Sequence, residues 1–172
     1  MNDGRLAPSH EAARDAASFG ILVRQHQSAL RGFLRRLTRG DHALADDLAQ
    51  ETFLEAYRKL SQFRGDRPIA GWLYAIAWSR FLMAARRRKL EPLDDDDGDL
   101  ALPEADSMLR LDMEKALSLL RAPERAALTL CFAAGMGHEE AAVTLGMPLG
   151  TLKSHIARGR EKLKTLLQEH AP

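Results

Sequence analysis

Apolar residues recur every three or four positions through most of the chain, which is the spacing of amphipathic helices. Gly40 and Asp41 predict the end of a first helix and the cap of a second. The stripe of the first helix contains Phe19, Leu22, Val23, His26, Leu30, Phe33, Leu34 and Leu37. The stripe of the second contains Ala45, Leu48, Ala49, Thr52, Phe53, Ala56 and Leu60. Both helices therefore have one side to bury.

The segment 68–89 differs because its apolar residues occupy two opposite helix faces. Trp72 lies on one face and Trp78 on the other, and the segment ends in the basic run Arg86, Arg87, Arg88, Lys89. Such a helix is buried on two sides or keeps one set of rings for a ligand. Aromatic rings beside cations suit single-stranded nucleic acid, because bases stack on the rings while the cations neutralise phosphate. A core role for the tryptophans and a solvated, dipole-stabilised helix end remain open.

The stretch 138–167 predicts a helix, a three-residue turn and a second helix. Gly146 allows the turn and Pro148 presets the following helical turn. In the second helix the predicted inner face is Leu152, Ile156, Gly159, Leu163 and Leu167, and the outer face is Thr151, Ser154, Ala157, Arg158 and Lys162. The flanks carry Lys153, His155 and Arg160. This small, polar and cationic face can enter the major groove, although a solvated final helix of a bundle has the same pattern.

The outer face of the second predicted helix is acidic and contains an exposed leucine. It consists of Asp47, Gln50, Glu51, Leu54 and Arg58. Such a strip fits a partner that offers arginines around a small apolar pocket. An ordinary solvated helix face is the alternative.

Composition excludes only a few classes of structure and function. The chain of 172 residues carries 25 basic and 24 acidic side chains, so the location of the charges matters more than their sum. The single cysteine, Cys131, lies in an apolar run and suits a buried thiol in a reducing compartment. We find no signal-peptide pattern and no apolar run long enough to span a membrane, and expect a cytoplasmic protein without membrane insertion. No residue pattern supports catalysis, a cofactor or a metal.

The organisation predicted from these patterns is two small helical domains separated by an acidic linker. Residues 1–17 are expected to form a loose arm that becomes helical near its end, and residues 18–89 to form the first helical domain. Residues 90–106 contain eight acidic side chains and no basic one, and cannot bury enough surface to fold alone. Residues 107–172 form the helix-turn-helix domain, whose helices run through Met113, Leu117, Leu128 and Phe132 into the turn region.

Two motif blocks are similar to a known family. The segment 46–89, DDLAQETFLEAYRKLSQFRGDRPIAGWLYAIAWSRFLMAARRRK, resembles the polymerase-binding and promoter-melting domain of extracytoplasmic-function sigma factors. The segment 135–163, GMGHEEAAVTLGMPLGTLKSHIARGREKL, resembles their C-terminal helix-turn-helix domain. The resemblance covers residues 18–168 and implies an all-α, two-domain transcription initiation factor that directs core RNA polymerase to promoters.

The resemblance also implies roles for residues. The clamp coiled coil of the polymerase would be bound by Asp47, Gln50, Glu51 and Leu54, with Phe53 at the edge. The melted minus-ten element would be held by Phe63, Arg64, Trp78, Ser79, Arg80, Arg86, Arg87 and Arg88. The minus-thirty-five duplex would be read by Thr151, Lys153, Ser154, His155 and Arg158. The polymerase flap and an anti-sigma factor are further implied partners, and we expect a monomer in their absence.

The sequence departs from the family pattern in both DNA-binding helices. Many relatives carry Arg, Asn and Asp where this chain has Trp78, Ser79 and Met83, so the family's base preference is not transferred. His155 stands where Arg is frequent, which predicts a weaker or pH-dependent contact with the upstream element. Two other functions remain: a decoy that occupies an anti-sigma factor, and a dimeric repressor that uses only the C-terminal domain.

Overall fold

The computed structural model describes residues 7–88 and 113–169, with side chains described for 16–88 and 113–168. All the elements in these two segments are helical, which confirms the predicted all-α class. They are α1 (Ala7–Leu37), α2 (His42–Lys59), the 3-10 turn η1 (Leu60–Gln62), α3 (Ile69–Arg88), α4 (Met113–Ser118), α5 (Ala122–Leu128), the π-helical turn η2 (Thr129–Ala133), α6 (His138–Leu145) and α7 (Leu149–Glu169). The predicted acidic linker, residues 90–106, lies outside the described residues.

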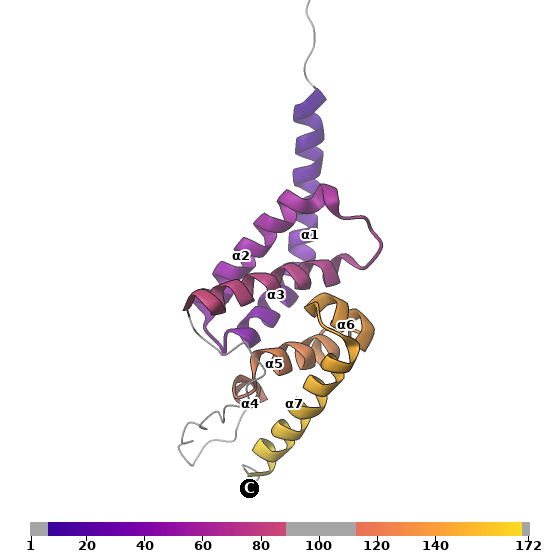
Figure 1. The fold of residues 1–172 in the computed structure, drawn as a ribbon. Helices are drawn as coiled ribbons and strands as arrows, with labels where there is room; N and C mark the ends of the chain where they lie inside the picture. Colours follow the sequence, from indigo (N-terminus) through magenta and orange to yellow (C-terminus); the bar gives the residue numbers. More distant parts are fainter. Residues whose placement is uncertain (1–6, 89–112, 170–172) are drawn as a thin grey trace, which may run out of the picture.

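The N-terminal half is a bundle of α1, α2 and α3 (Figure 1). Thr38 to Gly40 make the turn after α1, with Gly40 at φ 85°, and the Asp41 carboxylate accepts a hydrogen bond from the Leu44 N–H at 2.9 Å. The predicted helix end and cap are therefore confirmed. Residues 7–17, predicted as a loose arm, continue α1 instead, and this part of the helix extends beyond the bundle. A weak apolar period therefore did not exclude a helix.

The C-terminal half packs α4, α5 and α6 against the long helix α7. The predicted turn is present. Gly146 adopts the left-handed conformation at φ 64°, which allows the chain to turn between α6 and α7. Where α7 crosses α5, a Cβ at Gly159 would lie 2.8 Å from Leu128 Cδ1, closer than two carbons can approach. Any larger residue at this position would therefore have to displace the Leu128 side chain, and glycine permits the close crossing. Leu166 is buried at the end of α7 and Leu167 is 36% exposed, which corrects the predicted inner face.

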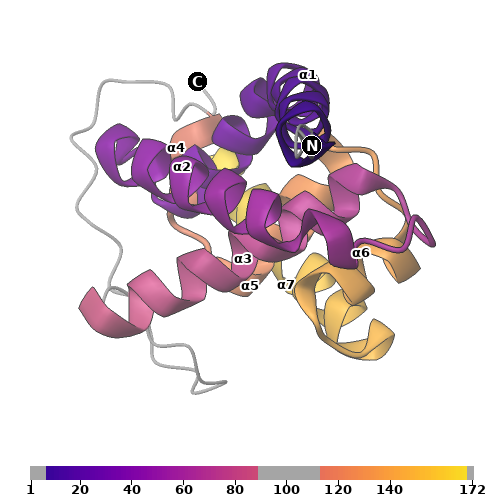
Figure 2. The ribbon, with the colours of Figure 1, turned by 90° about the horizontal axis from the view of Figure 1, so that it is seen from above.

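The two halves pack against each other along two contacts. The first joins α3 to α6, where a Cβ at Gly71 would lie 3.3 Å from Glu140 Oε1 and 3.5 Å from Thr144 Oγ1. The second joins the end of α1 to α4 and α5, and the views from the side and from above agree on this arrangement (Figure 2). One buried core consequently contains residues of both halves.

A fully buried arginine crosses the second contact. Arg125 of α5 has no exposed surface, and its guanidinium donates hydrogen bonds to the carbonyl of Leu120 and, at 2.7 Å, to the carbonyl of Leu37 at the end of α1. A C-terminal carbonyl of a helix has no partner within the helix, so Arg125 supplies one from the other half. Nearby, Arg36 donates two hydrogen bonds to Glu114 Oε1, at 3.0 and 2.8 Å.

Candidate nucleic-acid and partner interfaces

The acidic strip of α2 is exposed, as its helical period predicted. Asp47, Gln50 and Glu51 face solvent, and Leu54 is 57% exposed. Phe53 is half-buried at the edge of the strip. The opposite side of α2 is buried through Leu44, Ala45, Leu48, Ala49, Thr52 and Ala56. We call Asp47, Gln50, Glu51 and Leu54 the α2 ridge.

Glu55, which follows Leu54 of the ridge in the sequence, forms ion pairs with two basic side chains. Its carboxylate lies 2.6 Å from Lys59 Nζ and 2.5 Å from an Arg80 guanidinium nitrogen on α3. The hydrogen bond from Lys59, followed by the charge of Arg80, lowers the pKa of Glu55 against an opposing effect of burial. Arg80, predicted to contact DNA, is therefore engaged inside the N-terminal half in this structure.

The aromatic cluster of α3 is part of the core. Trp72 is 9% exposed and contacts Phe63 with ring centroids 5.1 Å apart, and Trp78 is 6% exposed and stacks on Phe81 at 5.7 Å. Trp78, predicted to meet a melted base, is buried in this structure, because α3 is covered by α1 and α2 on one side and by α6 on another. Of the two possibilities left by the sequence, burial on two sides is the one observed.

The other predicted minus-ten residues surround this core at the surface. Arg64 and Ser79 are exposed, and Arg86, Arg87 and Arg88 are exposed in the last turn of α3. Phe63 is half-buried against Trp72. The exposed cations thus lie at the end of a helix whose aromatic side chains hold it in place.

The predicted reading face of α7 is only partly exposed. Lys153, Ser154 and Arg158 are exposed and Thr151 is half-buried, with the Ser154 hydroxyl donating to the Gly150 carbonyl at 3.0 Å. His155 is 7% exposed, which corrects its predicted position on an accessible flank. Its Nδ1 lies 3.0 Å from an Arg158 guanidinium nitrogen. His155 therefore supports Arg158 from beneath.

A buried carboxylate that sequence reasoning missed lies under the same helix. Glu124 is 1% exposed, and its oxygens accept hydrogen bonds from Lys162 Nζ at 3.0 and 3.1 Å, with Arg158 Nε 3.8 Å away. It also accepts a hydrogen bond from the Arg121 N–H at the start of α5. Glu124 and Arg125 interrupt an apolar stripe that continues at Leu128, and that interruption is the signal that could have found them.

An apolar groove lies on the C-terminal half beside Arg36. Its volume is about 390 Å³, and Met113, Leu117, Phe132 and Leu163 line it, with Arg36 and Arg160 among the polar lining. Phe132 is 64% exposed, although it follows the buried Leu128 and Leu130 in the same apolar run. The π-helical turn Thr129–Ala133 explains the difference, because a wider turn rotates the following side chains away from the α-helical stripe.

Other chemistries find no support in the part of the chain that the structure describes. No group of three or more His, Cys, Asp or Glu side chains is arranged to hold a metal ion there. None of the described helices combines the length and apolarity needed to cross a bilayer. Cys131 is half-buried, and burial raises the pKa of its thiol.

Comparison with known proteins places both halves in one family. The family model for Sigma-70 region 2 matches residues 22–91, and the model for Sigma-70 region 4 matches residues 110–163. The chain belongs to the extracytoplasmic-function sigma factors of the sigma-70 family. Members of this family are transcription initiation factors that bind core RNA polymerase and direct it to promoters.

Individual relatives of this sigma factor are similar over most of its length. The RNA polymerase sigma-H factor of Pseudomonas aeruginosa is 36% identical over 90% of this chain and 88% of its own. The sigma factor SigE of Mycolicibacterium smegmatis is 37% identical over 90% of this chain, which spans only 63% of that longer protein. The solved sigma factor RpoE in complex with the anti-sigma factor NepR, from Bartonella quintana, has a TM-score of 0.71, is 33% identical, and is matched over 88% of this chain and 97% of that chain.

Proposed function

We propose that this sigma factor binds core RNA polymerase through the α2 ridge and acts on promoters by binding alone, without enzymatic chemistry of its own. The observation that carries the proposal is the exposure of Asp47, Glu51 and Leu54 on the outside of a helix whose other side is fully packed. Neither carboxylate has an ion pair with another described residue. An acidic surface around one apolar side chain fits the arginine-rich face of a coiled coil, which is the family's clamp contact.

The α7 face supports a contact with duplex DNA. Lys153, Ser154 and Arg158 project from the second helix of the helix-turn-helix, where base edges and phosphates of the major groove would be reached. Arg158 is oriented by His155 and Glu124, so it meets DNA as a guanidinium already held in one position. His155 is then a positioning residue and not a base contact.

The end of α3 supports a contact with the opened minus-ten strand. Arg86, Arg87 and Arg88 can neutralise its phosphates, while Arg64 and Ser79 are accessible nearby. Trp78 acts through the core, by fixing α3. This division differs from the roles implied by the family resemblance, in which Trp78 and Arg80 touch the strand.

The closed packing of the two halves is an inactive arrangement under this proposal. Minus-ten and minus-thirty-five elements are roughly 25 base pairs apart, or about 85 Å at 3.4 Å per base pair. A helix of 21 residues such as α7 is only about 31 Å long, and α6 touches α3 at Gly71. The halves must therefore separate before both elements are held.

An anti-sigma factor is the partner that we propose for the closed form. The Bartonella RpoE that was solved with NepR matches this chain with one superposition over both halves. The apolar groove around Phe132 offers a docking surface to such a partner or to the polymerase flap. A pure decoy is disfavoured, because it has no use for the exposed cations Arg86 to Arg88 and Lys153.

The test is charge reversal on the α2 ridge. The variant Asp47→Lys with Glu51→Lys is expected to reduce association with core polymerase at least about a hundredfold, because two attractions become repulsions. Its circular dichroism and melting temperature should remain those of the parent, since both side chains are exposed. The matched control Glu139→Lys with Glu161→Lys, two exposed carboxylates on α6 and α7, should associate normally. Equal association of the ridge variant would overturn the proposal.

A further inference from the structure

Two basic side chains of α7 share one buried carboxylate of α5. Glu124 is buried, whereas the side chains of Arg158 and Lys162 are about half exposed. The two helices cross closely at this point, and a Cβ at Gly159 would lie 3.4 Å from Glu124 Cβ. A buried carboxylate that loses its cation strongly destabilises a fold, so Glu124 needs at least one of the two basic side chains beside it.

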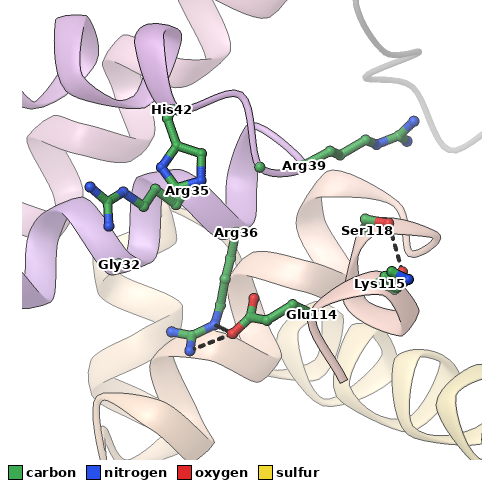
Figure 3. A pocket seen from close by; sticks show the side chains of 9 residues that line it. Gly32, Arg35, Arg36, Arg39, His42, Glu114, Lys115 and Ser118 are labelled. Atoms are coloured by element: carbon green, nitrogen blue, oxygen red, sulfur yellow. Dashed lines mark hydrogen bonds and ion pairs between the residues drawn. The ribbon is translucent and has the colours of Figure 1, made fainter. Parts of the chain in front are cut away.

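The two cations do not engage Glu124 equally. Lys162 Nζ donates hydrogen bonds to both carboxylate oxygens, at 3.0 and 3.1 Å. Arg158 Nε lies 3.8 Å from Oε1, which is beyond hydrogen-bond distance. Arg36 provides the contrast, because its guanidinium donates two hydrogen bonds to Glu114 Oε1, at 3.0 and 2.8 Å (Figure 3). Lys162 is therefore the main partner of Glu124, and Arg158 remains within reach of the same carboxylate.

This division leaves part of the Arg158 guanidinium for a ligand. Its Nη2 lies 3.0 Å from His155 Nδ1, and its Nε faces Glu124. Its Nη1 takes part in neither contact and can donate to a base edge or a phosphate. Lys162 also belongs to the outer face of α7 by helical period, yet its ammonium group is engaged by Glu124.

We propose that Lys162 is a positioning residue for DNA recognition, because it neutralises Glu124 and thereby leaves Arg158 available to the duplex. When the ammonium group is removed, Arg158 is the cation already close to the buried carboxylate. The carboxylate then draws the guanidinium from 3.8 Å into direct hydrogen bonds and withdraws it from the major groove. This consequence for DNA rests on the proposed contact of α7 with the duplex, whereas the sharing of Glu124 does not.

The first test compares two duplexes at one salt concentration and well below the melting temperature of each variant. One duplex is selected by the parent chain from a randomised library, and the other is a scrambled sequence of the same composition. Lys162→Met should lower the ratio of the two affinities about tenfold, the discrimination that one good base contact supplies. Lys162→Met with Glu124→Gln should restore most of the ratio, since no buried charge then attracts Arg158. The matched control Lys164→Met, an exposed lysine of the same helix, should leave the ratio unchanged.

The ratio separates the proposal from two simpler roles of Lys162. A direct phosphate contact, or a loss of folded protein, lowers the affinity for both duplexes together and leaves their ratio as it was. An unchanged ratio in Lys162→Met would therefore overturn the proposal. A ratio that falls and is not restored by Glu124→Gln would overturn it as well.

A second measurement follows Arg158 in the free chain and does not depend on DNA. The Nε–H signal of Arg158 in proton–nitrogen NMR can be assigned by its absence from Arg158→Lys. Its exchange with water should become slower in Lys162→Met, because a hydrogen bond to Glu124 forms, and should not become slower in Lys164→Met or in Lys162→Met with Glu124→Gln. An unchanged rate in Lys162→Met would contradict the sharing of Glu124. Slower exchange in a chain that selects no duplex would support the sharing and contradict the proposed DNA contact.

Discussion

Replacement of the buried Arg125 by methionine measures how strongly the two halves are joined. The guanidinium bonds the carbonyls of Leu120 and Leu37, and neither side of the contact is open to water. A hydrogen bond from a charged group contributes about 1.5–3 kcal/mol, and the loss of two is partly offset by relief from burying a charge. We expect Arg125→Met to lower the free energy of unfolding by about 2–4 kcal/mol.

Two optical probes separate the halves in this experiment. The chain has two tryptophans, Trp72 and Trp78, and both belong to α3, so their fluorescence follows the N-terminal half. Circular dichroism at 222 nm follows the helices of both halves. In urea, the two probes of the parent should coincide, and in Arg125→Met the dichroism midpoint should fall by about 1–2 M and precede the fluorescence change. The exposed Arg24→Met is the matched control.

The reasoning is refuted if Arg125→Met unfolds at the parent's midpoint with both probes superimposed. In that case the contact between Arg125 and the end of α1 contributes no net stability. A fall of the midpoint with coincident probes has a different meaning. It would show that the halves remain coupled through contacts that do not need Arg125, such as that of α3 with α6 and that of Arg36 with Glu114.

Three further outcomes follow from the packing and the pKa shifts. Gly159→Ala should destabilise by about 1–2 kcal/mol in urea unfolding, because the clash with Leu128 exceeds the gain in helix propensity, whereas Gly32→Ala, with no atom within 4 Å, should stabilise by about 0.5–1 kcal/mol. The pKa of Glu55 is lowered from its ordinary value of 4.5, so the ionised carboxylate stabilises the fold above pH 4.5, and this stabilisation is lost as the pH falls through the lower pKa of the folded state. The difference in melting temperature between the parent and Glu55→Gln should therefore be larger at pH 7 than at pH 3. The raised pKa of Cys131 predicts that its alkylation by iodoacetamide at pH 8 is slower than that of a free cysteine, and an equal rate would contradict the burial of the thiol.

Periodicity was sufficient for the features that depend on one helix at a time. The cap at Asp41, the turn at Gly146 and the exposure of Glu51 and Leu54 all follow from residues close together in the chain. These local signals also predicted the all-α class. The same holds for the buried side of α2, where small and large apolar residues alternate at helical spacing.

The sequence was least informative where a second element, or a change of helical register, decides the environment of a side chain. The sequence left burial and ligand binding both open for Trp78, and packing decides for burial because α3 is covered on more than one side. His155 lies on a flank by helical geometry but is buried beneath Arg158. Phe132 faces solvent because a π-helical turn shifts the register, and no propensity at that point indicates the extra residue. The packing between the two halves likewise cannot be predicted from the apolar stripe of any single helix.

The most direct test of the central claim is promoter-specific initiation in vitro. Core RNA polymerase, the purified chain and fragmented genomic DNA would be incubated with nucleotides, and the 5′ ends of the transcripts sequenced. The account predicts start sites that share two upstream elements, appear only with the chain, and disappear with Asp47→Lys and Glu51→Lys. Start sites identical to those of core polymerase alone would contradict it.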